Sequence, residues 1–231
     1  MAATEITVLS GGAMRRFLGE AIPLFERDSG HKVTIHYAVT REQKAAIEAG
    51  AAFDIALLPR AAIDQLIAAG KIEPRSPTLI ARSIVGLMVR AGEPAPDFGT
   101  VGAFVSLLRR AKSVSYSKGP SGEYVAELLQ RLGLAAEMRD KTVFAIGRPV
   151  GEVVAAGEAE IGMQQNIENQ LVKGAHLAGP LPRELGNFVP YTAGFRAGVP
   201  ASAAAQAFVK FLGTTEAVRI MRAKGLEPGN V

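Results

Sequence analysis

The step from strand to helix near the N-terminus constrains the fold more than any other feature of this sequence. An apolar strand at residues 6–9 runs into Ser10-Gly11-Gly12, and a helical pattern follows at once. Similar alternations cover residues 32–49 and 54–69, and the strand–helix order resumes after residue 100. Parallel strands joined through helices place their carboxyl ends on one edge of a sheet. The order therefore predicts an α/β fold with a ligand crevice at that edge.

Two apolar stretches divide this pattern. Residues 79–89 are too long for a typical strand, and residues 191–195 follow a proline-rich stretch, so each can run from one sheet into another. We expect two α/β lobes, residues 1–81 with 194–231 and residues 82–193, joined by a hinge of two crossings. Hinge motion at residues 81–85 and 191–195 would close the lobes on a ligand. Helices near 202–212 and 216–223 would return to the first lobe.

Composition narrows the function classes. The 231 residues carry a formal charge of +4, but lysine and arginine are scattered, so no nucleic-acid partner is expected. There is no cysteine, which excludes disulfides, thiol catalysis and a lipid-modified N-terminal cysteine. No apolar run reaches about 18 residues, so no insertion into a membrane is expected. Three scattered histidines predict neither a metal site nor a cofactor.

Several predicted helices begin at small or polar residues, and this points to an anion site. The first N–H groups of a helix have no intrahelical acceptor and lie at the positive end of its dipole. Ser10-Gly11-Gly12 leaves such groups uncovered, although a tight turn explains it equally well. Thr40 can simply cap the helix that follows, but Arg41 opposes the dipole there and suggests a compensating anion. Pro120-Ser121-Gly122 also starts a helix, where proline is a routine structural choice.

Five stretches, spread over nearly the whole chain, carry a resemblance to a known family. They are VLSGGAM at 8–14, IEAGAAFDIA at 47–56, PSGEY at 120–124, VAAGEAEIG at 154–162 and RAKGLEP at 222–228. Their order and spacing resemble the molybdate-binding branch of the substrate-binding proteins of ABC importers. The resemblance implies the type II periplasmic-binding-protein fold, in which two lobes hold an oxyanion with hydroxyl and N–H groups and no metal.

The resemblance also implies a ligand site, position by position. The first loop contributes Ser10, Gly11, Gly12 and Ala13, with alanine where the family has a serine. The second contact falls on Thr40, beside Arg41. Helix-start contacts fall on Ser121 with Gly122 and, near a second helix, on Val150. The family's tyrosine falls on Gln165, which can donate and accept hydrogen bonds or merely cap the next helix. The arginine fork suits a carboxylate or a phosphate better than a bare metal oxide.

These observations predict a monomeric, non-enzymatic solute-binding protein that captures a small anion, an oxyanion or a small carboxylate, for an ABC-importer permease. A periplasmic location is expected, although a cytoplasmic one stays open because the chain shows no signal peptide. Two alternatives stay open as well. One is a cytoplasmic ligand-sensing module related to LysR-type effector domains. The other is an enzyme on the same fold, for which no nucleophile or acid–base pair is visible; porphobilinogen deaminase resembles the fold but needs a cysteine.

Overall fold

The computed structural model describes residues 3–169 and 172–229. The chain forms two compact units, the first made of Met1–Arg82 with Pro190–Val231 and the second of Ser83–Val189. The predicted α/β fold class is confirmed in both units. The chain passes between the units twice, inside β4 (Thr78–Arg90) and at the start of β9 (Phe188–Phe195).

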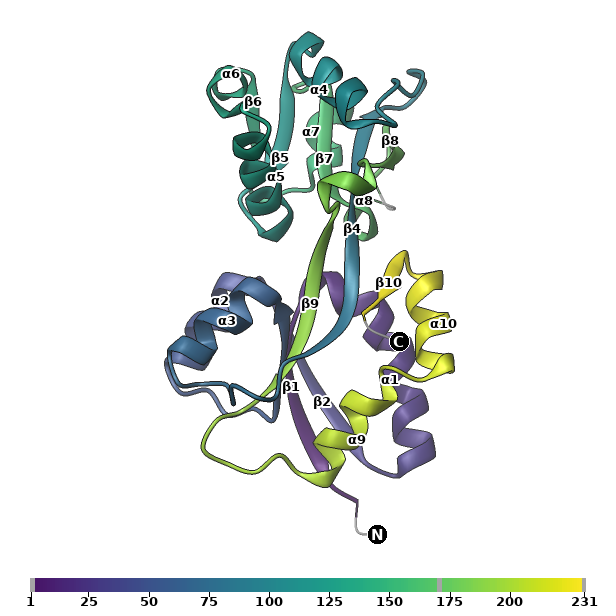
Figure 1. The fold of residues 1–231 in the computed structure, drawn as a ribbon. Coiled ribbons are helices and arrows are strands. Elements are labelled where there is room, and N and C mark those ends of the chain that lie inside the picture. The colour runs from purple at the N-terminus through teal and green to yellow at the C-terminus, as the bar shows by residue number, and fades with distance from the viewer. Residues whose placement is uncertain (1–2, 170–171, 230–231) are drawn as a thin grey trace. The chain divides into compact units, whose positions relative to one another are not determined.

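The first unit is built on parallel strands. Its sheet has the order β2-β1-β3-β9, in which β1 pairs in parallel with β2 and β3, and β9 runs antiparallel to β3. Helices α2 and α3 cover one face, and α1, α9 and α10 cover the other (Figure 1). Its remaining elements are β1 (Glu5–Gly11), η1 (Gly12–Met14), α1 (Arg15–Ser29), β2 (Lys32–Ala38), α2 (Thr40–Glu48), β3 (Ile55–Pro59), α3 (Arg60–Ala68), α9 (Ala203–Phe211), α10 (Thr215–Ala223) and β10 (Leu226–Pro228).

Apolar patterning explains these elements. All five residues of β3 are buried, because helices cover both faces of the sheet at that strand. In α1, buried positions Phe17, Leu18, Ala21, Ile22 and Phe25 recur at helical spacing. Gly30 ends that helix with φ of 72°, a left-handed conformation that glycine adopts without steric penalty.

The second unit repeats the parallel arrangement. Its strand order is β4-β7-β5-β6; β5 lies parallel to β6 and β7, and β4 pairs antiparallel with β7 and β8. Val143 and Ala145 of β6 pack with Val150 and Val153 of α7 in a small apolar cluster. The elements are α4 (Val101–Arg110), β5 (Val114–Ser117), α5 (Pro120–Arg131), α6 (Ala135–Arg139), β6 (Thr142–Ala145), α7 (Val150–Ala155), β7 (Ile161–Gln165), α8 (Asn166–Asn169), β8 (Ala175–Pro180) and η2 (Arg183–Leu185).

The C-terminal residues of the first unit are tied to β4 close to where that strand leaves the unit. Strand β10 pairs with β4, and the Gly229 N–H donates to the Ile80 carbonyl at 2.9 Å. The Arg82 guanidinium donates to the carbonyls of Pro228 and Gly229 at 3.0 and 2.9 Å. A Cβ on Gly229 would lie 2.1 Å from the Leu79 carbonyl oxygen, so the close approach requires glycine.

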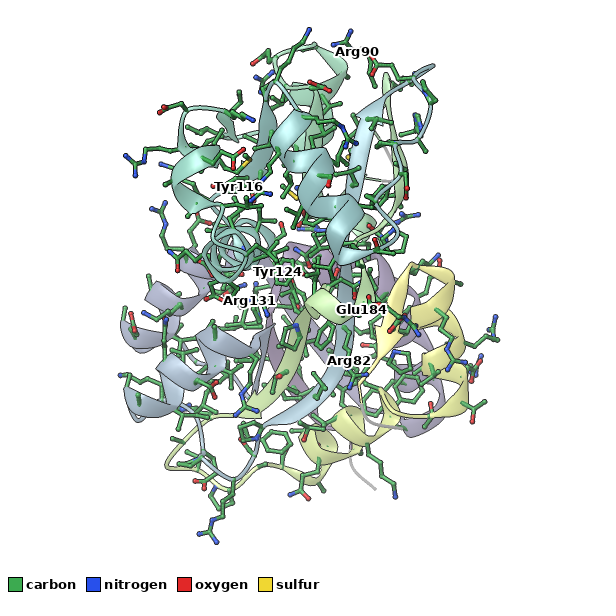
Figure 2. All side chains as sticks on the ribbon, turned by 45° about the horizontal axis from the view of Figure 1, so that its top comes forward. Arg82, Arg90, Tyr116, Tyr124, Arg131 and Glu184 are labelled. Atoms are coloured by element: carbon green, nitrogen blue, oxygen red, sulfur yellow. The ribbon has the colours of Figure 1, made fainter. Side chains whose placement is uncertain are left out.

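In the second unit, hydrogen bonds tie α5 to the turn that precedes β9. Tyr124 and Arg131, both on α5 and labelled in Figure 2, donate to the Leu185 carbonyl at 3.3 and 2.9 Å. Burial raises the pKa of Tyr124 to about 12, so its hydroxyl stays a donor at neutral pH. These bonds hold the helix whose N-terminus is a candidate contact.

A substitution at Gly122 tests the close packing of the first turn of α5 against the end of β5. A Cβ on Gly122 would lie 1.7 Å from the Ser117 carbonyl oxygen, a backbone atom that cannot move aside without displacing the strand. Gly122→Ala should therefore lower the free energy of unfolding by about 3 kcal/mol, measured by urea denaturation. Gly19→Ala in α1 is the matched control, because nothing lies within 4 Å of its Cβ position. That change should stabilise the chain by about 0.5–1 kcal/mol, and equal effects of the two substitutions would contradict this account.

Candidate functional site

In the first unit, the expected contacts converge where β1 and β2 end. A Cβ on Gly11 would lie 3.4 Å from Tyr191 Cε1 and 3.9 Å from Thr40 Oγ1, so the glycine, the tyrosine and the threonine meet there. Gly12 is exposed, with nothing within 4 Å of its Cβ position. Ala13 is buried, so the first loop offers backbone groups at this position and no hydroxyl.

Ser10 differs from the expectation. It is fully buried, and its hydroxyl donates to the Leu57 carbonyl at 3.2 Å, which joins β1 to β3. The side chain therefore stabilises the sheet in this structure. No local pattern indicates this hydrogen bond, because a serine before two glycines is typical of both a turn and an anion loop.

Thr40 and Arg41 also differ in their local structure. The helix begins at Thr40 rather than after Arg41, and Val39 is its N-cap residue without a capping side chain. The interpretation of Thr40 as a cap is therefore wrong. Arg41 is exposed in the first turn of α2, and no residue that the structure describes forms a hydrogen bond or an ion pair with its side chain. A cation so placed opposes the helix dipole and is available for an anion.

Two residues that sequence reasoning missed support this edge. Gln43 is buried, and its Nε2 donates to the Ser10 carbonyl at 3.2 Å and to the His36 carbonyl at 2.7 Å, which fixes α2 against β1 and β2. Arg15, the first residue of α1, lies with its guanidinium carbon 4.3 Å from the centroid of the Tyr37 ring. Burial raises the pKa of Tyr37, and the positive charge of Arg15 partly offsets that rise. Two arginines thus occupy the first turns of the two helices at this edge.

In the second unit, Ser121 and Gly122 lie in the first turn of α5, which has Gly119 as its N-cap and no capping side chain. Ser121 is 1% exposed. The Gly119 N–H donates to Ser117 Oγ at 3.2 Å, which fixes the turn. These two predicted contacts lie together.

The structure corrects the prediction that Val150 contacts the ligand. Its N–H was expected to be free for a ligand, but it donates to Gln164 Oε1 at 2.8 Å in a buried position. The protein's own side chain thus occupies the start of α7. Periodicity could not reveal this bond, because it joins residues that are 14 positions apart and come together only in the fold.

Gln165 is 1% exposed at the end of β7 and belongs to a small polar cluster with Gln164 and Glu168. Glu168 Oε2 accepts from Gln164 Nε2 at 2.5 Å, and Glu168 Oε1 accepts from Gln165 Nε2 at 3.3 Å. Gln165 Oε1 is buried and has no hydrogen-bond partner among residues 3–169 and 172–229. Burial raises the pKa of the Glu168 carboxyl, and the hydrogen bond from Gln164 partly offsets the rise.

The helices differ in whether a side chain caps their first turn. Thr100, Ser202 and Thr214 cap α4, α9 and α10 through their side-chain oxygens. No side chain of the N-cap residue does so at α1, α2, α5 and α7, nor at α3 and α6, which carry no expected contact. The lack of a capping side chain therefore does not by itself mark a site, but it leaves first-turn N–H groups of α2 and α5 able to bind an anion.

The comparisons with known proteins identify the family of the chain. A family model described as bacterial extracellular solute-binding protein matches residues 6–227. The chain belongs to this family. No helix in the described parts of this solute-binding protein is long and apolar enough to cross a membrane, and the same parts hold no group of three acidic, histidine or cysteine side chains suited to a metal ion.

Individual relatives differ in what their names say. The chain is 31% identical to an aconitate isomerase from Pseudomonas sp. over 97% of its own length and 88% of that protein. It shares its fold with a periplasmic molybdate-binding protein from Azotobacter vinelandii, with a TM-score of 0.72, 19% identity and coverage of 96% and 98% of the two chains. It also shares its fold with a tungstate-binding protein from Desulfovibrio alaskensis, with a TM-score of 0.76, 16% identity and coverage of 99% of this chain and 100% of that protein. The resemblance to molybdate-binding proteins inferred from the sequence is confirmed.

Glu168 predicts a pH dependence of stability. Because its pKa in the folded protein is above the ordinary value of 4.5, the folded state keeps the proton over a pH range in which the unfolded chain has lost it. Its contribution to stability is complete below pH 4.5 and is lost as pH rises through the raised pKa. Relative to wild type, Glu168→Gln should therefore gain about 2–4 °C in Tm between pH 4.5 and pH 8.

The measurement is a pair of thermal melts at each pH. The exposed Glu127, changed to Gln, is the matched control, and its Tm difference from wild type should not vary between the two pH values. A constant difference for Glu168→Gln would show that burial of this carboxyl does not influence folding.

Proposed function

We propose that this protein is an extracytoplasmic solute-binding protein that captures a small organic carboxylate and delivers it to the permease of an ABC importer. Membership of the extracellular solute-binding family supports the class. On this proposal the ligand contacts are Gly11, Gly12, Ala13, Thr40 and Arg41 in the first unit, and Ser121, Gly122 and Gln165 in the second.

Arg41 is the observation that carries the choice of a carboxylate. Its side chain is exposed, has no ion-pair partner within the described residues, and belongs to the first turn of an uncapped helix. A guanidinium offers two parallel N–H donors that match a carboxylate, whereas a bare tetrahedral oxyanion needs donors arranged around it. Arg15 at the start of α1 adds a second cation to the same edge. The name of the 31% identical relative points to aconitate, an unsaturated tricarboxylate.

Titration calorimetry tests this function. Citrate, cis-aconitate, trans-aconitate and malate should give saturable heats, and molybdate, tungstate and sulfate should bind at least about tenfold more weakly. Arg41→Ala should weaken carboxylate binding about 10- to 100-fold, since a hydrogen bond to a charged group contributes about 1.5–3 kcal/mol.

The matched control is Arg27→Ala, an exposed arginine in the last turn of α1 that pairs with Asp28 at 2.7 Å. It should leave the affinity unchanged. Carboxylate binding that survives Arg41→Ala at full strength, or tight binding of molybdate by the wild type, would overturn the choice of ligand.

A second candidate function, isomerisation of such a tricarboxylate, is favoured by one observation. The relative at 31% identity is named an isomerase and is matched over 97% of this chain. A buried carboxyl with a raised pKa, Glu168, is hydrogen-bonded to Gln165 and is a candidate proton carrier.

Proton NMR of cis-aconitate incubated with the protein tests this second function. Isomerase activity predicts a trans-aconitate signal that grows in proportion to protein concentration and does not appear with heat-denatured protein. Arg41→Ala should slow the conversion about tenfold or more at low substrate concentration. If cis-aconitate binds but remains unchanged relative to the buffer control, the protein only binds it.

A further inference from the structure

The second unit brings together two polar groups of opposite hydrogen-bonding character. Strands β5 and β7 are neighbours and run parallel, with Val114 opposite Ile161 and Ser115 opposite Gly162. Their carboxyl ends therefore lie on the same edge of the sheet. The first turn of α5 follows β5 after two residues, and Gln165 is the last residue of β7.

The α5 side of this edge supplies hydrogen-bond donors. The helix has 12 residues, begins without a capping side chain, and contains the buried Ser121 in its first turn. Gly122 is buried in the same turn, where the lack of a Cβ lets the helix start directly against the Ser117 backbone. Helix-start N–H groups and a hydroxyl bind an ionised carboxylate.

The β7 side supplies an acceptor that lacks a donor. Gln165 Nε2 donates to Glu168, while Gln165 Oε1 has no partner in the part of the chain that the structure describes, although the residue is only 1% exposed. Glu168 also accepts from Gln164 Nε2, so an ionised Glu168 fixes the amide of Gln165 with its nitrogen toward the carboxylate and its oxygen away from it. A buried carbonyl oxygen without a donor is unfavourable, and a ligand that brings a donor removes that penalty.

We infer that the anion bound by this protein carries an O–H group that donates to Gln165 Oε1 while an ionised carboxylate of the same molecule is bound at the start of α5. The inference rests on the proposed function and specifies its ligand class. The O–H group is either an alcohol hydroxyl or one carboxyl that keeps its proton in the site. Molybdate and sulfate at neutral pH have no O–H group, so Gln165 selects against them. Glu168 acts as a positioning residue for Gln165.

Calorimetry with a matched ligand pair tests this inference on the full chain. Citrate and tricarballylate have the same three carboxylates and differ only in the hydroxyl of citrate. If the hydroxyl is the donor, citrate binds about tenfold or more tightly than tricarballylate at pH 7.5. If a retained carboxyl proton is the donor, tricarballylate takes up about one proton on binding, measured from its heats in Tris and in PIPES at one pH.

Two variants connect the result to named side chains. Gln165→Met keeps the length of the side chain and removes the acceptor, so it should reduce the citrate preference below about threefold or abolish the proton uptake. Glu168→Gln is the second variant. An amide at position 168 can donate as well as accept, so it no longer fixes the orientation of the Gln165 amide. The preference for citrate over tricarballylate should therefore fall in this variant as well. Gln206→Met, at an exposed position of α9, is the control and should behave as wild type.

The outcomes distinguish a failure of this inference from a failure of the proposed function. Equal affinity for citrate and tricarballylate with no proton uptake overturns the inference and leaves carboxylate binding in place. A wild-type preference retained in a folded Gln165→Met also overturns it. The absence of saturable heat with either ligand overturns the proposed function itself.

Discussion

Uncapped helix starts at the carboxyl ends of parallel strands are the constraint on which the candidate site depends. Parallel pairing of β1 with β2, and of β5 with β7, brings α2 and α5 to the edges where those strands end. The N-cap residues of both helices lack a capping side chain. First-turn N–H groups of these helices can then bind another acceptor, although the Glu42 N–H already bonds to the Val39 carbonyl and the Gly119 N–H to Ser117 Oγ. Such a backbone is well suited to a negatively charged ligand before any charged side chain is considered.

Charged and polar side chains then narrow the range of anions. In the first unit, Arg15 and Arg41 add positive charge near backbone groups that are themselves donors. In the second unit, the Val150 N–H at the start of α7 is bonded to Gln164, which leaves the start of α5 as the candidate donor group. Gln165 introduces an acceptor where the other groups are donors. A site of this composition differs chemically from one that surrounds a bare tetrahedral oxyanion with donors alone.

The fold was predictable from the sequence because apolar spacing and strand–helix order are local signals. The long stretch at 79–89 corresponds to β4, which runs through both units, and the short helices at 202–212 and 216–223 are α9 and α10 of the first unit. The roles of individual polar groups were less predictable. Ser10 bonds to Leu57, Val150 to Gln164, and Gln43 to the ends of two strands, and each of these bonds depends on residues distant in sequence.

The path of the chain has a consequence for how the protein is made. The second unit is one continuous segment, Ser83–Val189, whereas the first needs residues from both ends of the polypeptide. Arg82 finds its partner Pro228 at a separation of 146 residues, and Ile80 bonds to the neighbouring Gly229. During synthesis, the second unit can therefore reach its native structure before β9, α9, α10 and β10 have been made. An incomplete first unit would expose the edge of β3 until β9 is synthesised and pairs with it, and an exposed strand edge favours aggregation.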